Sequence, residues 1–125
     1  MKILLITDQH FGVRNDNQHF INHYARFYGK VVIPFIKASG IKEVISLGDT
    51  FDRRRYINFM SLDSAKEMWF DQLVKLGCNH TMLIGNHDIY YKNTLRVNAP
   101  HEILGEYNFD VIDKPTTKSY DGTDI

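Results

Sequence analysis

The sequence predicts an α/β fold, in which a mostly parallel β-sheet is flanked by helices. Short apolar runs of strand length occupy Ile3–Ile6, Glu43–Leu47 and His80–Ile84. A polar motif follows each run, and apolar residues at helical spacing fill the two intervals between the runs. Strands and helices that alternate in this order form parallel sheets with right-handed crossovers.

The first strand and the first helix are read from continuous and periodic apolar residues. The run Ile3–Ile6 is continuously apolar, which predicts a strand buried on both faces of the sheet. From Phe20 to Ile36 the apolar residues recur at helical spacing. Pro34 has no backbone donor, so we expect this helix to kink or split near Lys30–Ile33.

A second helix is expected between the second and third strands. Ser61 is a good N-cap for a helix over Leu62–Leu76. The apolar arc of this helix is wider than one core-facing stripe, so it is either buried between layers or offers a surface to another subunit. Later in the chain, Phe109–Asp113 predicts a fourth strand and Thr116–Tyr120 an edge strand.

The composition is that of an ordinary globular protein. Its 125 residues form one domain or part of one. Lys plus Arg and Asp plus Glu both number 15, so the formal net charge is zero. The overall charge therefore gives no indication of a nucleic-acid partner. The single cysteine, Cys78, excludes an intramolecular disulfide and is expected to be a small buried residue. Because we find neither a signal peptide nor a run of membrane-spanning length, we expect a cytoplasmic protein that does not bind membranes.

The polar motifs that follow the strands carry the candidate chemistry. They are Asp8-Gln9-His10, Gly48-Asp49-Thr50-Phe51-Asp52-Arg53 and Gly85-Asn86-His87-Asp88. Sites in open α/β sheets lie at the carboxyl ends of the strands, so all three motifs are expected at one edge. In an extended backbone, residues two apart project to the same side, which allows Asp8 and His10 to converge on one ion.

The predicted metal ligands are Asp8, His10, Asp49 and Asn86, a set of oxygen and nitrogen donors without thiolates. Such a set favours manganese, iron or zinc over a soft metal. Two ions about 3.5–4 Å apart can share one carboxylate as a bridge, and Asp49 is our candidate. The pair would lower the pKa of a water and neutralise a phosphoryl oxygen, which are the two requirements of phosphate-ester hydrolysis.

In order and spacing, the three motifs resemble the first three signatures of the calcineurin-like metallophosphoesterases, from Met1 to about Asn93. The Asp-x-His-x-Gly start at Asp8–Gly12 and the Gly-Asp-x-Phe-Asp form resemble the DNA-repair nuclease branch. That branch includes SbcD-type exonucleases and phage recombination nuclease subunits. The resemblance implies the layered fold of this family, with residues 1–125 as the N-terminal part of the domain.

The resemblance also implies a role for each site residue. Asp8 and His10 would hold the first metal ion, Asp49 would bridge the two ions, and Asn86 would bind the second. His87 would stabilise the transition state or protonate the leaving oxygen.

Two neighbours of the bridging aspartate complete the implied catalytic group. Asp52 would orient His87, and Arg53 would bind a phosphoryl oxygen. An aspartate and an arginine at these two positions also resemble the phosphatases of the family. The alternative function is therefore a phosphatase or a small-molecule phosphodiesterase.

The function implied by the resemblance is phosphodiester hydrolysis by a DNA exo- or endonuclease subunit of recombination or repair. Two divalent ions are expected, with manganese as the first choice and iron, zinc or magnesium as alternatives. The implied partners are DNA, an ABC-type ATPase with a coiled coil, and a second copy that forms a homodimer through Leu62–Leu76. A phage-encoded protein of this kind would act in the host cytoplasm.

The sequence departs from the family pattern after the third motif. The later signatures, an isolated histidine and a Gly-His-x-His pair, are absent, and the last histidine is His101. We therefore expect the N-terminal half of the fold, with a half site that binds metal weakly and with a sheet edge and an apolar face left uncovered. Such a half would associate with another copy or with a missing half. The remaining alternative is a non-catalytic fragment that lacks the distal metal ligands.

Overall fold

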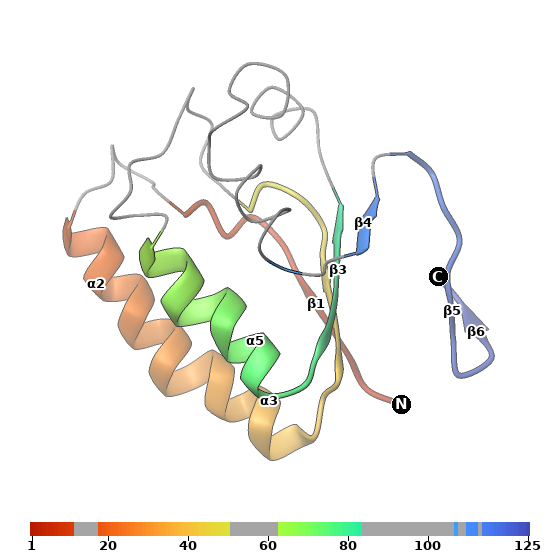
Figure 1. Ribbon diagram of the computed structural model, residues 1–125, viewed down its shortest axis with the longest axis horizontal. Coiled ribbons are helices and arrows are strands. Elements are labelled where there is room, and N and C mark those ends of the chain that lie inside the picture. The colour runs from red at the N-terminus through yellow and green to blue at the C-terminus, as the bar shows by residue number, and fades with distance from the viewer. Residues whose placement is uncertain (12–17, 51–62, 84–106, 108–109, 113) are drawn as a thin grey trace.

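A computed structural model describes residues 1–11, 18–50, 63–83, 107, 110–112 and 114–125 (Figure 1). Four strands pair side by side in chain order, and every pairing between them is parallel. They are β1 (Ile3–Ile6), β2 (Glu43–Ser46), β3 (Asn79–Leu83) and β4 (Asp110–Ile112). The predicted α/β fold with a parallel sheet is confirmed, including the fourth strand.

The register of the sheet brings the ends of β1 and β2 to the same level. Ile6, the last residue of β1, pairs with Ser46, the last residue of β2, and Ser46 pairs with Met82 of β3. The segments that leave β1 and β2 therefore start beside each other at the carboxyl edge. This edge is the one at which the sequence predicts the site.

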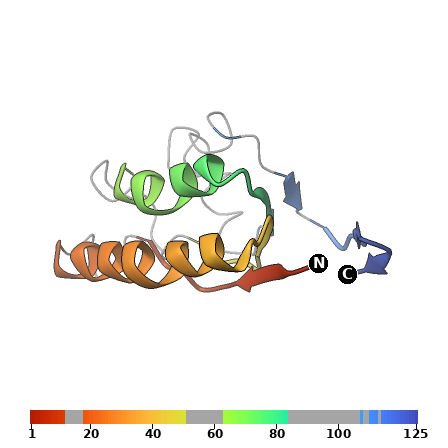
Figure 2. The ribbon, with the colours of Figure 1, turned by 90° about the horizontal axis from the view of Figure 1, so that it is seen from below.

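The prediction that β1 is buried on both faces is wrong. Leu4 and Ile6 pack against the core cluster, whereas the side chain of Leu5 is 54% exposed. Among the described residues, the helices form a single layer on one face of the sheet (Figure 2). β1 also lies at one edge of the described sheet. The side chain of Leu5, which points away from the helices, is therefore not covered as a continuous apolar run would predict.

The first helix consists of α2 (Gln18–Phe27), a wide π-helical turn labelled η1 (Tyr28–Val32), and α3 (Ile33–Ser39). In the wide turn the Ile33 amide donates to the Tyr28 carbonyl, one residue further back than in an α-helix. This turn ends at Val32, two residues before Pro34, so the helix changes its geometry within the predicted stretch Lys30–Ile33. A proline cannot donate a backbone hydrogen bond of a regular α-helix. The helix ends at Gly40, which has a φ of 69°.

The second helix contains helical residues 63–65, a second wide turn η2 (Lys66–Phe70), and α5 (Asp71–Lys75). Four of its side chains form the centre of the core: Ala65, Trp69, Phe70 and Leu73. The wide turn lets both Trp69 and Phe70 face inward, so both are fully buried. The described residues pack one side of this helix against the core and leave Val74 on another side 61% exposed, so burial between layers and a surface for another subunit both stay predictions. The predicted N-cap, Ser61, lies outside the described residues.

The predicted edge strand over Thr116–Tyr120 is instead a separate antiparallel hairpin. It pairs β5 (Ser119–Tyr120) with β6 (Thr123–Asp124). Asp121 and Gly122 form the turn with φ values of 52° and 84°, the left-handed geometry that suits tight hairpins. Lys118 donates to the Thr81 hydroxyl over 3.1 Å, which ties the hairpin to β3. Within the described ranges, no helix has the length and apolar character needed to cross a membrane.

Cys78 and His80 both contact neighbouring strands and loops of the fold, and Cys78 is partly buried where the sequence predicts a buried residue. Cys78 is partly buried and donates to the Ile41 carbonyl over 3.4 Å, and burial raises the pKa of its thiol. His80 is buried, and its Nε2 lies 2.7 Å from the Ser46 hydroxyl. Burial disfavours the charged imidazole and lowers the pKa of His80 from 6.5 to about 4.

The buried His80 predicts a loss of stability in mild acid. Between pH 6.5 and about 4 the unfolded chain binds a proton at this position and the folded chain does not. The free energy of unfolding should therefore be constant above the unfolded pKa and fall by about 3 kcal/mol as the pH drops through this window. Urea unfolding at pH 7 and at pH 5 measures the effect. A His80→Gln variant should show a shallower pH dependence, and equal slopes would contradict the assignment.

Candidate metal centre

The loops that leave β1 and β2 run side by side and are joined by backbone hydrogen bonds. The Leu47 amide donates to the Ile6 carbonyl over 2.8 Å, where the strands end. Beyond that point, the amides of Asp8, His10 and Phe11 donate to the carbonyls of Gly48, Asp49 and Thr50, over 3.2, 3.0 and 2.9 Å. The pairing of the two strands thus continues into the motifs, which fixes the two loops relative to each other.

Three of the predicted ligands adopt a backbone conformation that L-residues rarely use. Asp8, His10 and Asp49 have φ values of 53°, 51° and 52°. Asp and His tolerate this left-handed region better than most residues, but it still costs about 1–2 kcal/mol at each position. Such conformations concentrate at functional sites, where the surrounding structure holds them in place. The hydrogen bonds between the two loops are that support.

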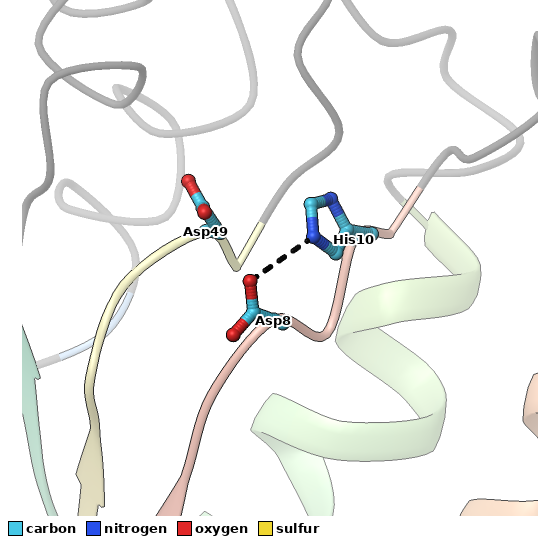
Figure 3. A group of neighbouring side chains, drawn as sticks. All are labelled: Asp8, His10 and Asp49. Atoms are coloured by element: carbon cyan, nitrogen blue, oxygen red, sulfur yellow. Dashed lines mark hydrogen bonds and ion pairs between the residues drawn. The ribbon is translucent and has the colours of Figure 1, made fainter.

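The side chains of Asp8, His10 and Asp49 converge above the carboxyl edge (Figure 3). One potential ligand atom from each lies within 4.8 Å of the others. The His10 Nε2 is 3.3 Å from the Asp8 Oδ1. The structure therefore brings together three of the four predicted ligands. Asn86 lies outside the described residues.

The three predicted catalytic residues also lie outside the described residues. They are Asp52, Arg53 and His87. The described part of the site consists of the first motif and the start of the second.

The electrostatics of the group favour an ionised Asp8. The Thr7 hydroxyl donates to the Asp8 Oδ2 over 2.9 Å, and this bond is the main reason that the pKa of Asp8 is lowered. Slight desolvation opposes the shift, while His10 and Asp49 reinforce it. The Asp8 side chain is 57% exposed and that of His10 is 27% exposed, so both are accessible from solvent.

This donor set fits a divalent cation. Two carboxylates and one imidazole, without a thiolate, suit manganese, iron, zinc or magnesium better than a soft metal. The separation of the ligand atoms is in the range that one ion can span.

Two residues of the first motif contribute in ways that we did not predict. Thr7 supports the Asp8 carboxylate, and Gln9 turns inward, where its amide donates to the Tyr28 hydroxyl over 2.9 Å. The segment is not the extended backbone that the sequence analysis assumed, because Asp8 and His10 are left-handed, yet the Gln9 side chain is buried while that of Asp8 is exposed. The partner of Gln9 could not be found from the sequence, because Tyr28 is 19 residues away on another element.

Gly48 is expected to be intolerant of a side chain. It has a φ of 119°, and its carbonyl accepts the Asp8 amide. A Cβ at this position would meet nothing within 4 Å, so a Gly48→Ala change acts through the backbone alone. We expect it to reduce the free energy of unfolding by about 1–3 kcal/mol and to weaken metal binding.

Gly40 provides the matched control for this prediction. It also has a positive φ, 69°, and open space around its Cβ position, but it ends a helix away from the site. Gly40→Ala should cost about 1 kcal/mol of stability without changing Mn²⁺ affinity. Denaturant unfolding and Mn²⁺ titration of both variants compare the two effects. Equal Mn²⁺ affinity in the two variants would show that the Gly48 backbone does not shape the site.

Comparisons with known proteins agree with this geometry. A family model described as calcineurin-like phosphoesterase matches residues 1–124. Exonuclease subunit 1 of Enterobacteria phage T4 is 38% identical over 123 residues, which are 98% of this chain and 36% of that protein. The chain thus spans well under half of the length of this relative. The resemblance inferred from the three motifs is confirmed, and the chain belongs to the calcineurin-like phosphoesterases, a family of metal-dependent hydrolases.

Proposed function

We propose that the protein is a nuclease subunit that hydrolyses DNA phosphodiesters with the help of divalent metal ions. The observation that carries the proposal is the convergence of Asp8, His10 and Asp49 at the carboxyl edge, each with a left-handed backbone. Phosphoester hydrolysis is the chemistry of the family. The choice of DNA is supported by the similarity to a phage exonuclease subunit.

Asp8, His10, Asp49 and Asn86 are the proposed metal ligands, and Asp49 is the proposed bridge between two ions. Divalent ions held by these residues would supply a water of lowered pKa and positive charge against a phosphoryl oxygen. The Thr7 hydroxyl donates to the Asp8 carboxylate and favours the ionised form that a cation requires. Manganese is the first choice for the native metal.

The remaining proposed roles belong to side chains outside the described residues. His87 stabilises the transition state or donates a proton to the leaving oxygen. The role proposed for Asp52 is to orient the ring of His87 through a hydrogen bond. Arg53 binds a phosphoryl oxygen of the substrate through its planar guanidinium.

The proposed assembly follows from the nuclease assignment. The relative is named as a subunit, which supports a complex with further chains. We propose an ABC-type ATPase with a coiled coil as the partner, a homodimer through the second helix, and a role in recombination or repair. The proposed location is the cytoplasm, which for a phage protein is that of the host.

Degradation of linear DNA in the presence of Mn²⁺ tests the proposed function. We expect nucleotide or oligonucleotide release that EDTA abolishes and that added Mn²⁺ restores. Titration with Mn²⁺ should show binding to the same protein. Absence of both binding and cleavage would favour a non-catalytic unit, and would contradict the proposal.

A phosphatase or small-molecule phosphodiesterase is the second candidate. The observation that favours it is the Asp52-Arg53 pair, which resembles the phosphatase form of the second motif. Rapid turnover of a small phosphoester together with intact DNA would support this candidate over the nuclease.

A further inference from the structure

We propose that Gln9 and Tyr28 form a buried positioning pair that aims the two ligands of the first motif at the metal. Gln9 lies between Asp8 and His10 and points away from both, into the protein. The inference deepens the proposed metal-dependent function and rests on it. Neither residue touches the reacting atoms in this proposal, because both act by holding the loop.

The contact between the two side chains is direct and shielded from water. The Gln9 Nε2 donates to the Tyr28 hydroxyl over 2.9 Å, and the two residues are 5% and 4% exposed. The other amide atom, Oε1, is buried and has no hydrogen-bond partner among the described residues. Within the described ranges this bond is the one that anchors the Gln9 side chain, and losing it would leave a buried polar group unsatisfied.

Tyr28 is a rigid anchor. Its ring centroid lies 5.3 Å from that of Trp69 and 5.5 Å from that of Phe11. It also opens the wide turn η1, where its carbonyl accepts the Ile33 amide. Burial raises the pKa of Tyr28 to about 12, so the hydroxyl remains protonated at working pH. The Tyr28 hydroxyl is therefore fixed in position by the packing of its ring and by the backbone of the helix, and it is suited to hold the loop of Asp8 and His10.

The need for an anchor follows from the backbone of the loop. Asp8 and His10 have φ values of 53° and 51°, which the chain does not adopt without support. The hydrogen bonds to the β2 loop hold this segment from one side. Gln9, the residue between the two ligands, holds the same segment from the core side through its hydrogen bond to Tyr28. A relaxed backbone would turn the carboxylate and the imidazole away from a common ion.

Mn²⁺ titration of four variants tests the pair. Tyr28→Phe removes the acceptor but keeps the ring, and Gln9→Met removes the donor but keeps the length. We expect each to weaken Mn²⁺ binding about tenfold, as is usual when a group that orients a metal ligand is lost. The double variant should weaken it no further, because both changes break the same bond. Tyr24→Phe, one turn earlier on the same helix, is the matched control and should bind like the wild type.

Hydrogen exchange without metal gives a second readout. We expect the amides of His10 and Phe11 to exchange about tenfold faster in Tyr28→Phe than in Tyr24→Phe, because the loop opens more often. Unchanged exchange and unchanged Mn²⁺ affinity, with lower thermal stability, would reduce the pair to a packing contact and overturn the inference. A wild type that does not bind Mn²⁺ would instead refute the proposed function, and the exchange comparison would still decide the role of the pair.

Discussion

Replacing Asp49 with alanine is expected to abolish phosphodiester hydrolysis. Asp49 is the one described ligand that comes from the loop after β2, and its carboxylate is the proposed bridge between the ions. Without it, Asp8 and His10 from the neighbouring loop are left to hold a cation from one side. Loss of a charged ligand from a small set should lower metal affinity by at least about 100-fold, and hydrolysis fails with it.

The alanine variant changes the backbone as well as the ligand, so it needs a partner variant. Asp49 has a φ of 52°, and its carbonyl accepts the His10 amide. Asparagine tolerates this conformation and alanine does not. Asp49→Asn should therefore retain wild-type stability but lose activity, whereas Asp49→Ala should lose both. Mn²⁺ titration, DNA degradation and urea unfolding of the two variants separate the effects. Wild-type cleavage by Asp49→Asn would show that this carboxylate is not a metal bridge.

Much of the fold could be predicted because its signals are local. The strand β2 and the break before Pro34 follow from apolar runs and from the missing donor of proline. The exposure of Leu5 could not be predicted in this way, since it depends on which faces of the sheet the rest of the chain covers. The hairpin around Asp121 was missed for a related reason, because two-residue strands carry almost no periodic signal.

In the candidate site, too, the features with local sequence signals could be predicted and those set by tertiary contacts could not. The positions of Asp8, His10 and Asp49 after neighbouring parallel strands were enough to predict that they meet, although the extended backbone expected at Asp8 and His10 is wrong. The left-handed backbone that aims them was not predicted, because it is imposed by hydrogen bonds between loops about 40 residues apart in the chain. The anchoring of Gln9 by Tyr28 depends on tertiary packing in the same way.

Replacing His87 with alanine should slow hydrolysis by about 10²–10⁴-fold while leaving the metal ions bound. The reason is the role proposed for its imidazole, which acts on the substrate and not on the ions. Mn²⁺ affinity should therefore stay at the wild-type value, in contrast to the Asp49 variants. A parallel loss of metal affinity would make His87 a ligand and contradict the assignment.

The leaving group decides between the two roles open to His87. A nitrophenolate departs without a proton, whereas a deoxyribose hydroxyl needs one. If His87 protonates the leaving oxygen, His87→Ala should lose most of its rate on DNA and little on a nitrophenyl phosphodiester. If it stabilises the charge of the transition state, both substrates should slow alike, because both develop that charge. Single-turnover rates with saturating Mn²⁺ measure the ratio, and full activity on both substrates would remove His87 from the mechanism.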